Sequence, residues 1–229
     1  MRKLIGWWVG VCLSVLSGSV WAESCQLPEV LETPRLEKLD CQNQQAQVNG
    51  FLLALSWSPS FCASQGDRPA NRHQCQDNQF RWVVHGLWPQ DYNAKAAKCS
   101  QPRHCQSSRV DQATLAQYLC TVPGVQLMQA QWQKHGSCAF NDPGSYFAQL
   151  EQLHQRLQLP ELTESKIQVE VLQQRFIELN PGLQAEHMLV RTGKGNRFNE
   201  VWLCMDQDYR YRRCNGRGAP ASAIIQVPQ

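Results

Sequence analysis

The sequence predicts a single α+β domain built on a central, mainly antiparallel sheet, with several helices and a framework of disulfides. Short apolar segments and amphipathic segments are interspersed without the regular strand–helix–strand order of a parallel sheet. No Pro- or Gly-rich linker divides the 229 residues, a length that one large domain can fill. Hydrophobic residues make up 42% of the chain, with 8 Trp, and this composition excludes intrinsic disorder.

The N-terminus, residues 1–22, has the features of a secretory signal peptide. Two basic residues follow Met1, an apolar run extends over 4–16, and small residues precede a cleavage site after Ala22. The apolar run is shorter than the ~20 residues that a membrane-spanning helix needs, so we expect export and no membrane anchor. The mature domain would then be residues 23–229, located in the periplasm or secreted.

The chain has 11 Cys, and removal of the leader takes away Cys12 and leaves an even number. An even count in an exported protein indicates a disulfide framework. A metal site at Cys99, His104 and Cys105 is the alternative, but their spacing does not fit a zinc pair. We therefore expect no metal and no other cofactor. The remaining cysteines, enough for five bridges, are Cys25, Cys41, Cys62, Cys75, Cys99, Cys105, Cys120, Cys138, Cys204 and Cys214.

The first part of the domain should consist of an irregular arm followed by a strand. Residues 23–49 are rich in Gln, Glu and Pro and carry no periodic pattern. The continuous apolar run 50–57 (GFLLALSW) ends close to a proline and predicts a buried strand. A loop should follow this strand as far as Cys75.

A second strand is expected over 80–85 (FRWVVH), stopped by Gly86 and Pro89, and residues 90–110 are loop-like. Polar and charged residues dominate this loop. Three further strands are expected towards the C-terminus, over 187–191, 201–205 and 223–227.

Four helices are expected between these two groups of strands. Asp111 should cap the first helix, which runs to Leu119. The second extends over 126–138, and Asp142-Pro143 begins the third, whose leucines recur on one side. The fourth covers 169–179 and ends at a Pro-Gly turn.

The formal net charge is +3, and charged residues make up 18% of the chain, which is too weak to indicate a nucleic-acid binder. The charge is unevenly placed. Residues 67–109 contain seven Lys/Arg and three acidic residues, and residues 191–217 contain the same numbers. These segments could line a positive cleft or form ordinary solvated surface. The charge distribution alone favours the solvated surface. Arg210, Arg212 and Arg213 are open to the same two interpretations, and a solvated hairpin edge is favoured.

Two segments carry histidines in settings that suit chemistry. The first is FRWVVHGLWP over 80–89, and the second is QWQKHGSC over 131–138. A single histidine in an apolar segment is often a core residue, but here each histidine precedes a glycine and lies near an aromatic residue. Glycine lets another backbone or a ligand approach closely, so the pair indicates a candidate site.

These segments resemble a known family. HGLWP at 85–89 and W-x-K-H-G-S-C at 132–138 resemble the two active-site segments of the ribonuclease T2 family, and LALSWSPSFC at 53–62 is similar to a segment of its bacterial members. The resemblance covers about residues 50–140. It implies an α+β fold and cleavage of single-stranded RNA through a 2′,3′-cyclic phosphate, without a metal.

The resemblance also implies the roles of individual residues. His135 would be the general base that takes the 2′-hydroxyl proton, and His85 the general acid that protonates the leaving 5′-oxygen. Imidazole suits both tasks near neutral pH. Lys134 would stabilise the negative charge that develops on phosphorus. DNA lacks the 2′-hydroxyl and should not be cleaved.

Two positions depart from the family pattern. Gln131 stands where the family usually has Glu, and Ala130 where His or Tyr is frequent. Gln131 remains a candidate catalytic residue because its amide can hydrogen-bond a phosphoryl oxygen, but it cannot exchange a proton. A catalytically reduced RNA-binding or interaction protein on the same scaffold is therefore the alternative. A disulfide-rich adhesion module unrelated to RNA is disfavoured by the paired motifs.

Other side chains have simpler interpretations. Trp88 could stack on a base of single-stranded RNA or belong to the core, whereas Trp57 and Trp82 are expected in the core. Cys204 and Cys214 should form a local bridge, and Cys138 should pair with a cysteine of the 99–105 loop. RNA is the expected partner, with no membrane contact, and we expect a monomer.

Overall fold

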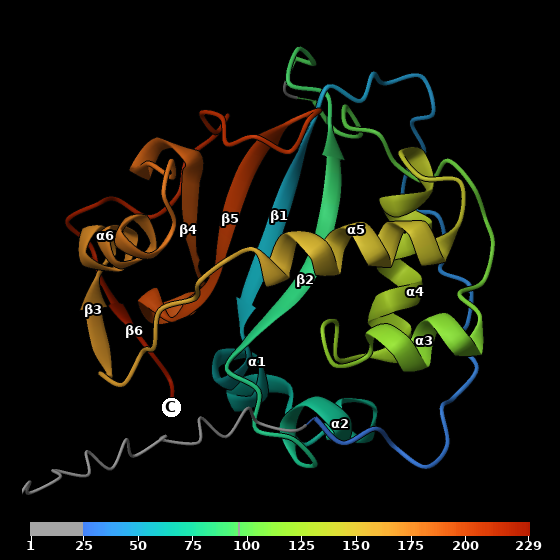
Figure 1. Cartoon of the computed structure of the whole chain (residues 1–229), viewed down its shortest axis with the longest axis horizontal. Helices are drawn as coiled ribbons and strands as arrows, with labels where there is room; N and C mark the ends of the chain where they lie inside the picture. Colours follow the sequence, from blue (N-terminus) through green and yellow to red (C-terminus); the bar gives the residue numbers. More distant parts are fainter. Residues whose placement is uncertain (1–24, 96) are drawn as a thin grey trace, which may run out of the picture.

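Strand β1 (Gly50–Trp57) lies inside a four-stranded antiparallel sheet of order β2-β1-β5-β4. Its neighbours are β2 (Trp82–Gln90) and β5 (Phe198–Asp206), and β4 (Met188–Thr192) pairs with the outer edge of β5. This computed structural model describes residues 25–95 and 97–229 (Figure 1). The expected signal peptide lies outside the described residues.

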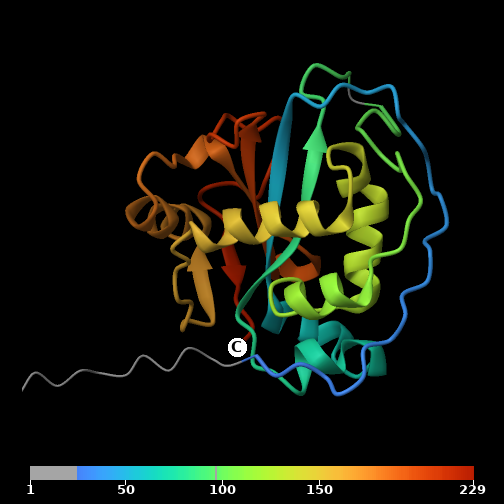
Figure 2. The same cartoon turned by 45° about the vertical axis from the view of Figure 1, so that its right-hand side comes forward.

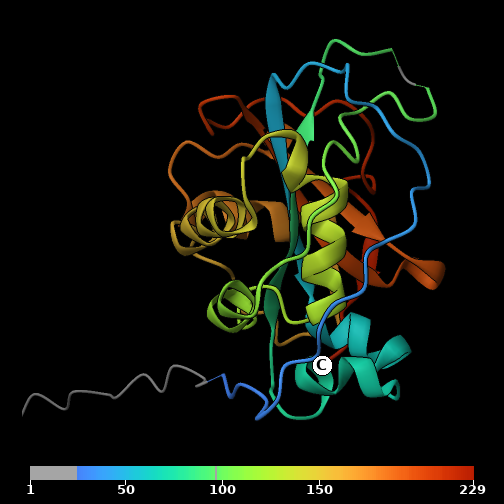
Figure 3. The ribbon, with the colours of Figure 1, turned by 90° about the vertical axis from the view of Figure 1, so that its right-hand side faces the viewer.

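The helices surround the sheet on one face, at its β2 edge and at one end. They are α1 (Ser58–Gln65), α2 (Arg72–Cys75), α3 (Gln112–Tyr118), α4 (Val125–Lys134), α5 (Pro143–Gln155) and α6 (Val169–Leu179). Helix α5 crosses β1 and β2 (Figures 1 and 2), α1 and α2 lie at the end of these strands, and Figure 3 shows the yellow-green α4 in front of the sheet, near the β2 edge. In the part of the chain that the structure describes, no helix is long and apolar enough to span a bilayer.

Alternation along β1 creates two apolar layers of unequal size. Leu53, Leu55 and Trp57 pack into the main core with α3 to α6. Leu52 and Ala54 point to the other face, where they form a small cluster with Cys204 and are packed by Trp88, Tyr92, Trp202 and Cys214. Because both faces are covered, the run GFLLALSW is buried almost throughout.

The α+β class and most elements are confirmed. Residues 25–49 are irregular, and Asp111 and Asp142 cap α3 and α5 by accepting hydrogen bonds of 2.9 Å from the amides of Thr114 and Ser145. Helix α6 has its expected bounds. Trp57 and Trp82 lie in or against the core. One short pairing was not expected: β3 (Lys166–Gln168) with β6 (Ile224–Gln226), which form a separate two-stranded sheet.

The loop expected between β1 and Cys75 is wrong, because α1 and α2 occupy it. Pro59 lies in the first turn of α1, where a proline needs no amide hydrogen bond. Gln74 donates to Ser58 Oγ at 3.0 Å and closes the two helices onto each other. The apolar residues of α1 do not gather on one side of the helix, so its sequence shows no helical periodicity.

The expected stop of the second strand is also wrong, because β2 continues through Gly86 and Pro89 to Gln90. A proline is tolerated because β2 is an edge strand, whose outward amides need no partner strand. Helix α4 is shorter than expected and ends at Lys134. His135 leaves the helical conformation (φ −125°, ψ −62°), and residues 136–138 form a 3₁₀ turn.

Five disulfides cross-link the described part of the chain. Both expected pairings are confirmed: Cys204 with Cys214, and Cys138 with Cys105 of the 99–105 loop. Cys99 and Cys105 both have sulfurs in disulfides, which argues against the metal site considered for them. The other bridges are Cys25–Cys120, Cys41–Cys99 and Cys62–Cys75.

The Cys105–Cys138 bridge should stabilise the fold more than the local C-terminal bridge. It closes a loop of 33 residues and Cys204–Cys214 one of 10, so chain entropy predicts losses of about 4 and about 3 kcal/mol on removal. Urea unfolding of the two double Cys→Ala variants measures both losses. A larger loss for Cys204→Ala/Cys214→Ala would contradict the loop-closure argument.

Candidate active site

A β-bulge in β2 sets the position of His85. Ala54 of β1 pairs with Gly86, and Leu55 pairs with Val84, so His85 is an extra residue without a partner opposite it. Such bulges re-aim a side chain. His85 contacts Glu200 and Trp88, which both lie on the face of the sheet away from the main core.

Glu200 of β5 holds His85 in a fixed orientation. His85 Nδ1 donates to Glu200 Oε1 at 2.7 Å, Ser56 Oγ donates to the same oxygen at 2.8 Å, and Trp202 Nε1 donates to Oε2 at 2.6 Å. Burial opposes ionisation of Glu200, but the hydrogen bonds from His85, Trp202 and Ser56 outweigh it and lower its pKa. The site therefore contains a part-buried, ionised carboxylate that is hydrogen-bonded to His85.

Glu200 was not expected from the sequence. It lies 115 residues from His85 along the chain. Glu200, Trp202 and Cys204 share the face of β5 that points away from the main core. An acidic residue in this alternating pattern was the only local signal in the sequence.

Trp88 is the centre of the site. Its ring lies edge-on to His85, with centroids 5.3 Å apart, and it is stacked with His135 at 5.4 Å and 27°. Its Nε1 donates to Gln131 Oε1 at 2.7 Å. The rings of both histidines thus contact one tryptophan, whose indole is held by a buried amide.

Gly86 makes this arrangement possible. A Cβ at this position would collide with Gln131 Oε1 and would lie 2.6 Å from Trp88 Nε1. Gly136 has a similar role beneath the second segment, since a Cβ there would lie 2.6 Å from Cγ of Tyr146. Tyr146 is fully buried, and its hydroxyl accepts a hydrogen bond of 3.1 Å from the amide of Leu87. Tyr146 therefore connects both segments.

His135 is placed where it stays uncharged. It follows directly on α4, and its amide donates to Gln131 O at 3.0 Å. Burial lowers the pKa of His135 well below its usual value of 6.5, and the positive charges of Lys134 and Arg103 lower it further. A neutral imidazole is available to accept a proton.

Lys134 is connected to the N-terminal arm. Its Nζ lies 3.7 Å from Asp40 Oδ2, and the same carboxylate is bound by Arg103 and, at 3.0 Å, by His104 Nε2. The Arg103 hydrogen bond is the main reason that the pKa of Asp40 is well below its usual range. The amide of His104 also donates to Lys134 O at 3.0 Å. Asp40, Arg103 and His104 were not expected near the site.

The structure brings all five predicted site residues together: His85, Trp88, Gln131, Lys134 and His135 belong to one connected set of contacts or neighbouring positions. The interpretation of Gln131 changes, because its Oε1 is engaged by Trp88. A cavity of about 200 Å³ opens beside the pair His85–Glu200 and is lined mainly by apolar groups, among them Val83 and Leu127.

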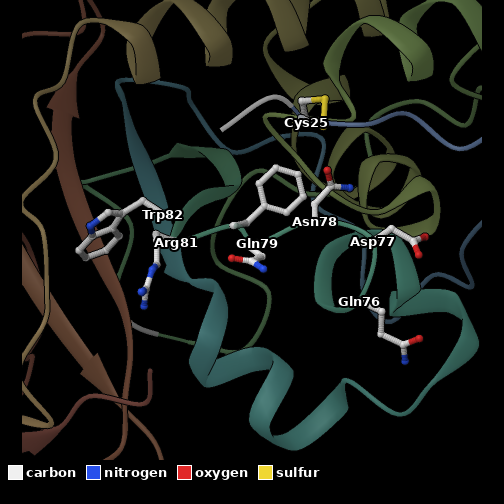
Figure 4. A pocket seen from close by; sticks show the side chains of 9 residues that line it. Cys25, Gln76, Asp77, Asn78, Gln79, Arg81 and Trp82 are labelled. Carbon is white, nitrogen blue, oxygen red and sulfur yellow. A yellow bond between two sulfur atoms is a disulfide. The ribbon is translucent and has the colours of Figure 1, made fainter. Parts of the chain in front are cut away.

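A second hollow, of about 530 Å³, lies elsewhere (Figure 4), and its lining includes neither residues 85–89 nor residues 131–138. Residues 76–82 line it beside the Cys25–Cys120 bridge. It has no histidine in its lining, whereas two histidines contact Trp88. The candidate site is therefore the one around Trp88.

Two histidines contact one tryptophan on the face of the sheet opposite the main core, and Lys134 precedes the second of them in the chain. Residues 48–214 match the model of the Ribonuclease T2 family, and the chain belongs to this family.

Named relatives agree with this assignment. A protein named Probable ribonuclease from Haemophilus influenzae is 38% identical over 185 residues, which are 77% of this chain and 64% of that protein. Ribonuclease I of Escherichia coli is 29% identical over 149 residues, 50% of this chain and 56% of that one. The matched region therefore spans less than two thirds of either relative.

A solved structure supports the fold. The RNase-related protein from Calystegia sepium has a TM-score of 0.60 at 18% identity, and the match covers 80% of this chain and 98% of that one. At this identity, the likeness concerns the fold alone.

Gly86→Ala should destabilise the protein by about 1–3 kcal/mol, because the added methyl displaces Trp88 or Gln131 from a filled space. Gly144→Ala is the control: the added Cβ would lie 3.2 Å from Oδ1 of the capping Asp142, a contact that a shift of a few tenths of an ångström relieves, and alanine favours a helix. Urea unfolding measures both changes. Equal stabilities of the two variants would refute the close approach at Gly86.

His135→Gln should flatten the dependence of stability on acid pH. Below about pH 6.5, His135 is protonated in the unfolded state but stays neutral in the folded state. The free energy of unfolding of the wild-type protein therefore falls as the pH is lowered. The variant should lose less, by at most about 1.4 kcal/mol per pH unit. Denaturation at several pH values between 4.5 and 7.5 tests this, and parallel curves would contradict it.

Proposed function

We propose that this protein is a metal-independent endoribonuclease that cleaves single-stranded RNA by internal transesterification and leaves 2′,3′-cyclic phosphate ends. The observation that carries the proposal is the electrostatic difference between the two histidines beside Trp88. His85 is hydrogen-bonded to the carboxylate of Glu200, whereas burial and neighbouring cations keep His135 neutral. A neutral imidazole suits the role of general base, and an imidazole whose other nitrogen donates to a carboxylate is held in a fixed orientation for the role of general acid.

The proposed reaction uses two proton transfers, one to His135 and one from His85. Neutral His135 takes the proton of the 2′-hydroxyl, and the 2′-oxygen forms a bond to phosphorus. The bond from phosphorus to the 5′-oxygen breaks, and His85 gives its proton to that oxygen. Lys134 offsets the negative charge on the phosphorane. The reaction ends with His135 protonated and His85 neutral.

Gln131 and Trp88 have supporting roles in this proposal. Gln131 holds the indole of Trp88 through its Oε1, and it positions the ring against the two histidines. Trp88 is the platform on which substrate lies. The apolar cavity beside His85 offers room for a nucleobase of the strand. The family name and those of the two bacterial relatives support RNA as the substrate.

The alternative is an RNA-binding protein with reduced catalysis. The departures at Gln131 and Ala130 favour it, because an amide and a methyl group replace side chains that can take part in proton exchange. In this alternative, the protein binds RNA but does not cleave it.

We also propose that the protein acts after export, in the periplasm or outside the cell. The support is the pairing of ten cysteines in five disulfides, which persist only in oxidising compartments. The signal-like segment 1–22 supports the same proposal.

Purified, oxidised protein in EDTA should cleave single-stranded RNA to 2′,3′-cyclic phosphate ends and leave the matching DNA intact. His85→Ala and His135→Ala should each lower the rate by about 10²- to 10⁴-fold with unchanged circular dichroism. His187→Ala, outside the site, is the control. Phosphorus NMR or mass spectrometry of the products identifies the ends.

Several results would count against the proposal. Loss of cleavage in EDTA would refute metal independence, and full activity of either histidine variant would refute its role. RNA binding without cleavage by the wild-type protein would favour the alternative.

A further inference from the structure

An arginine is fixed on the same face of the sheet as the candidate active site. Arg191 of β4 lies directly opposite Glu200 in the pairing of β4 with β5. Its guanidinium carbon lies 4.4 Å from the ring centroid of Trp202, and its Nη1 donates to Arg217 O at 2.8 Å. Stacking and one hydrogen bond therefore hold the guanidinium in place.

This arginine forms no ion pair with the residues that the structure describes. Both oxygens of Glu200 accept hydrogen bonds from His85, Ser56 and Trp202, and within residues 25–95 and 97–229 no carboxylate lies within 4.0 Å of the Arg191 guanidinium. The nearby Arg210 and Arg213 differ, since each is paired with an acid, Asp208 and Glu186. Arg191 keeps most of its donors free for an external anion.

Arg191 is continuous with the site around Trp88. The rings of Trp88 and Trp202 are in edge contact, with centroids 5.1 Å apart, and Arg191 covers Trp202. His85 on β2 and Arg191 on β4 are separated by three strand spacings, about 14 Å. This separation places Arg191 beyond the reacting phosphate, at a distance that suits a neighbouring nucleotide of the same strand.

The surroundings of Arg191 are also basic. The segment 191–217 contains seven Lys/Arg against three acidic residues, and Arg212 lies 3.7 Å over the ring of Tyr92 on the same face. A guanidinium fits a phosphate through paired donors. We propose that Arg191, held on Trp202, binds a backbone phosphate of RNA outside the cleaved linkage. This inference rests on the proposed function.

The test compares Arg191→Gln with a matched control, Arg156→Gln, at the exposed end of α5 on the covered face. The probe is a fluorescent 2′-O-methyl hexanucleotide, which lacks the attacking hydroxyl. Arg191→Gln should weaken its binding by about 5- to 10-fold at low salt and reduce the slope of log K against log salt by about 0.7, the contribution of one phosphate on a single strand. Arg156→Gln should match the wild type.

Cleavage provides the second measurement. The loss of kcat/KM in Arg191→Gln should be larger for an RNA hexanucleotide than for a dinucleoside monophosphate, which has no second phosphate to reach the arginine. An equal loss on both substrates would show that Arg191 positions Glu200 and would overturn the subsite. Binding equal to that of Arg156→Gln would overturn it as well.

The two proposals can fail separately. A wild-type protein that binds the hexanucleotide with the expected dependence on Arg191 but leaves RNA intact supports the phosphate subsite and refutes the nuclease. A wild-type protein that cleaves RNA, with no effect of Arg191→Gln on binding or salt slope, supports the nuclease and refutes the subsite.

Discussion

The hydrogen bond of 2.7 Å between His85 and Glu200 is the constraint on which the site depends. It exists because a bulge in β2 turns His85 to the face that Glu200 occupies on β5, two strands away in the sheet. Without the bulge, a residue one step along the strand would take that place and every later side chain of β2 would change face. Trp88 would then no longer lie against His135.

The rest of the fold supplies rigidity to this contact. Tyr146 of α5 supports both histidine segments at once, through the amide of Leu87 and the close packing of Gly136. Because Leu87 follows His85 by two residues and Gly136 follows His135 directly, one buried phenol fixes the spacing of the two imidazoles. Function here depends on core packing as much as on the polar groups themselves.

The sequence was informative where local signals decide the structure. β1, the aspartate caps of α3 and α5, and the histidine segments all have such signals. Tertiary effects decided the rest. β2 continues through Pro89 because it is an edge strand. Helix α4 ends at Lys134, and Gly136 beyond its end lies close against the ring of Tyr146. Glu200 has only a weak local signal, an acidic residue in an alternating strand, and its contact with His85 exists only because β5 pairs with β1.

The arrangement around Asp40 connects the disulfides to the chemistry. Asp40 precedes Cys41, which is bridged to Cys99, and Arg103 and His104 precede Cys105, which is bridged to Cys138. The Asp40 carboxylate, which faces Lys134, thus lies in a segment that disulfides connect to the rest of the fold. A reduced chain lacks the two bridges next to Asp40 and His104, so fewer constraints would hold these groups beside Lys134.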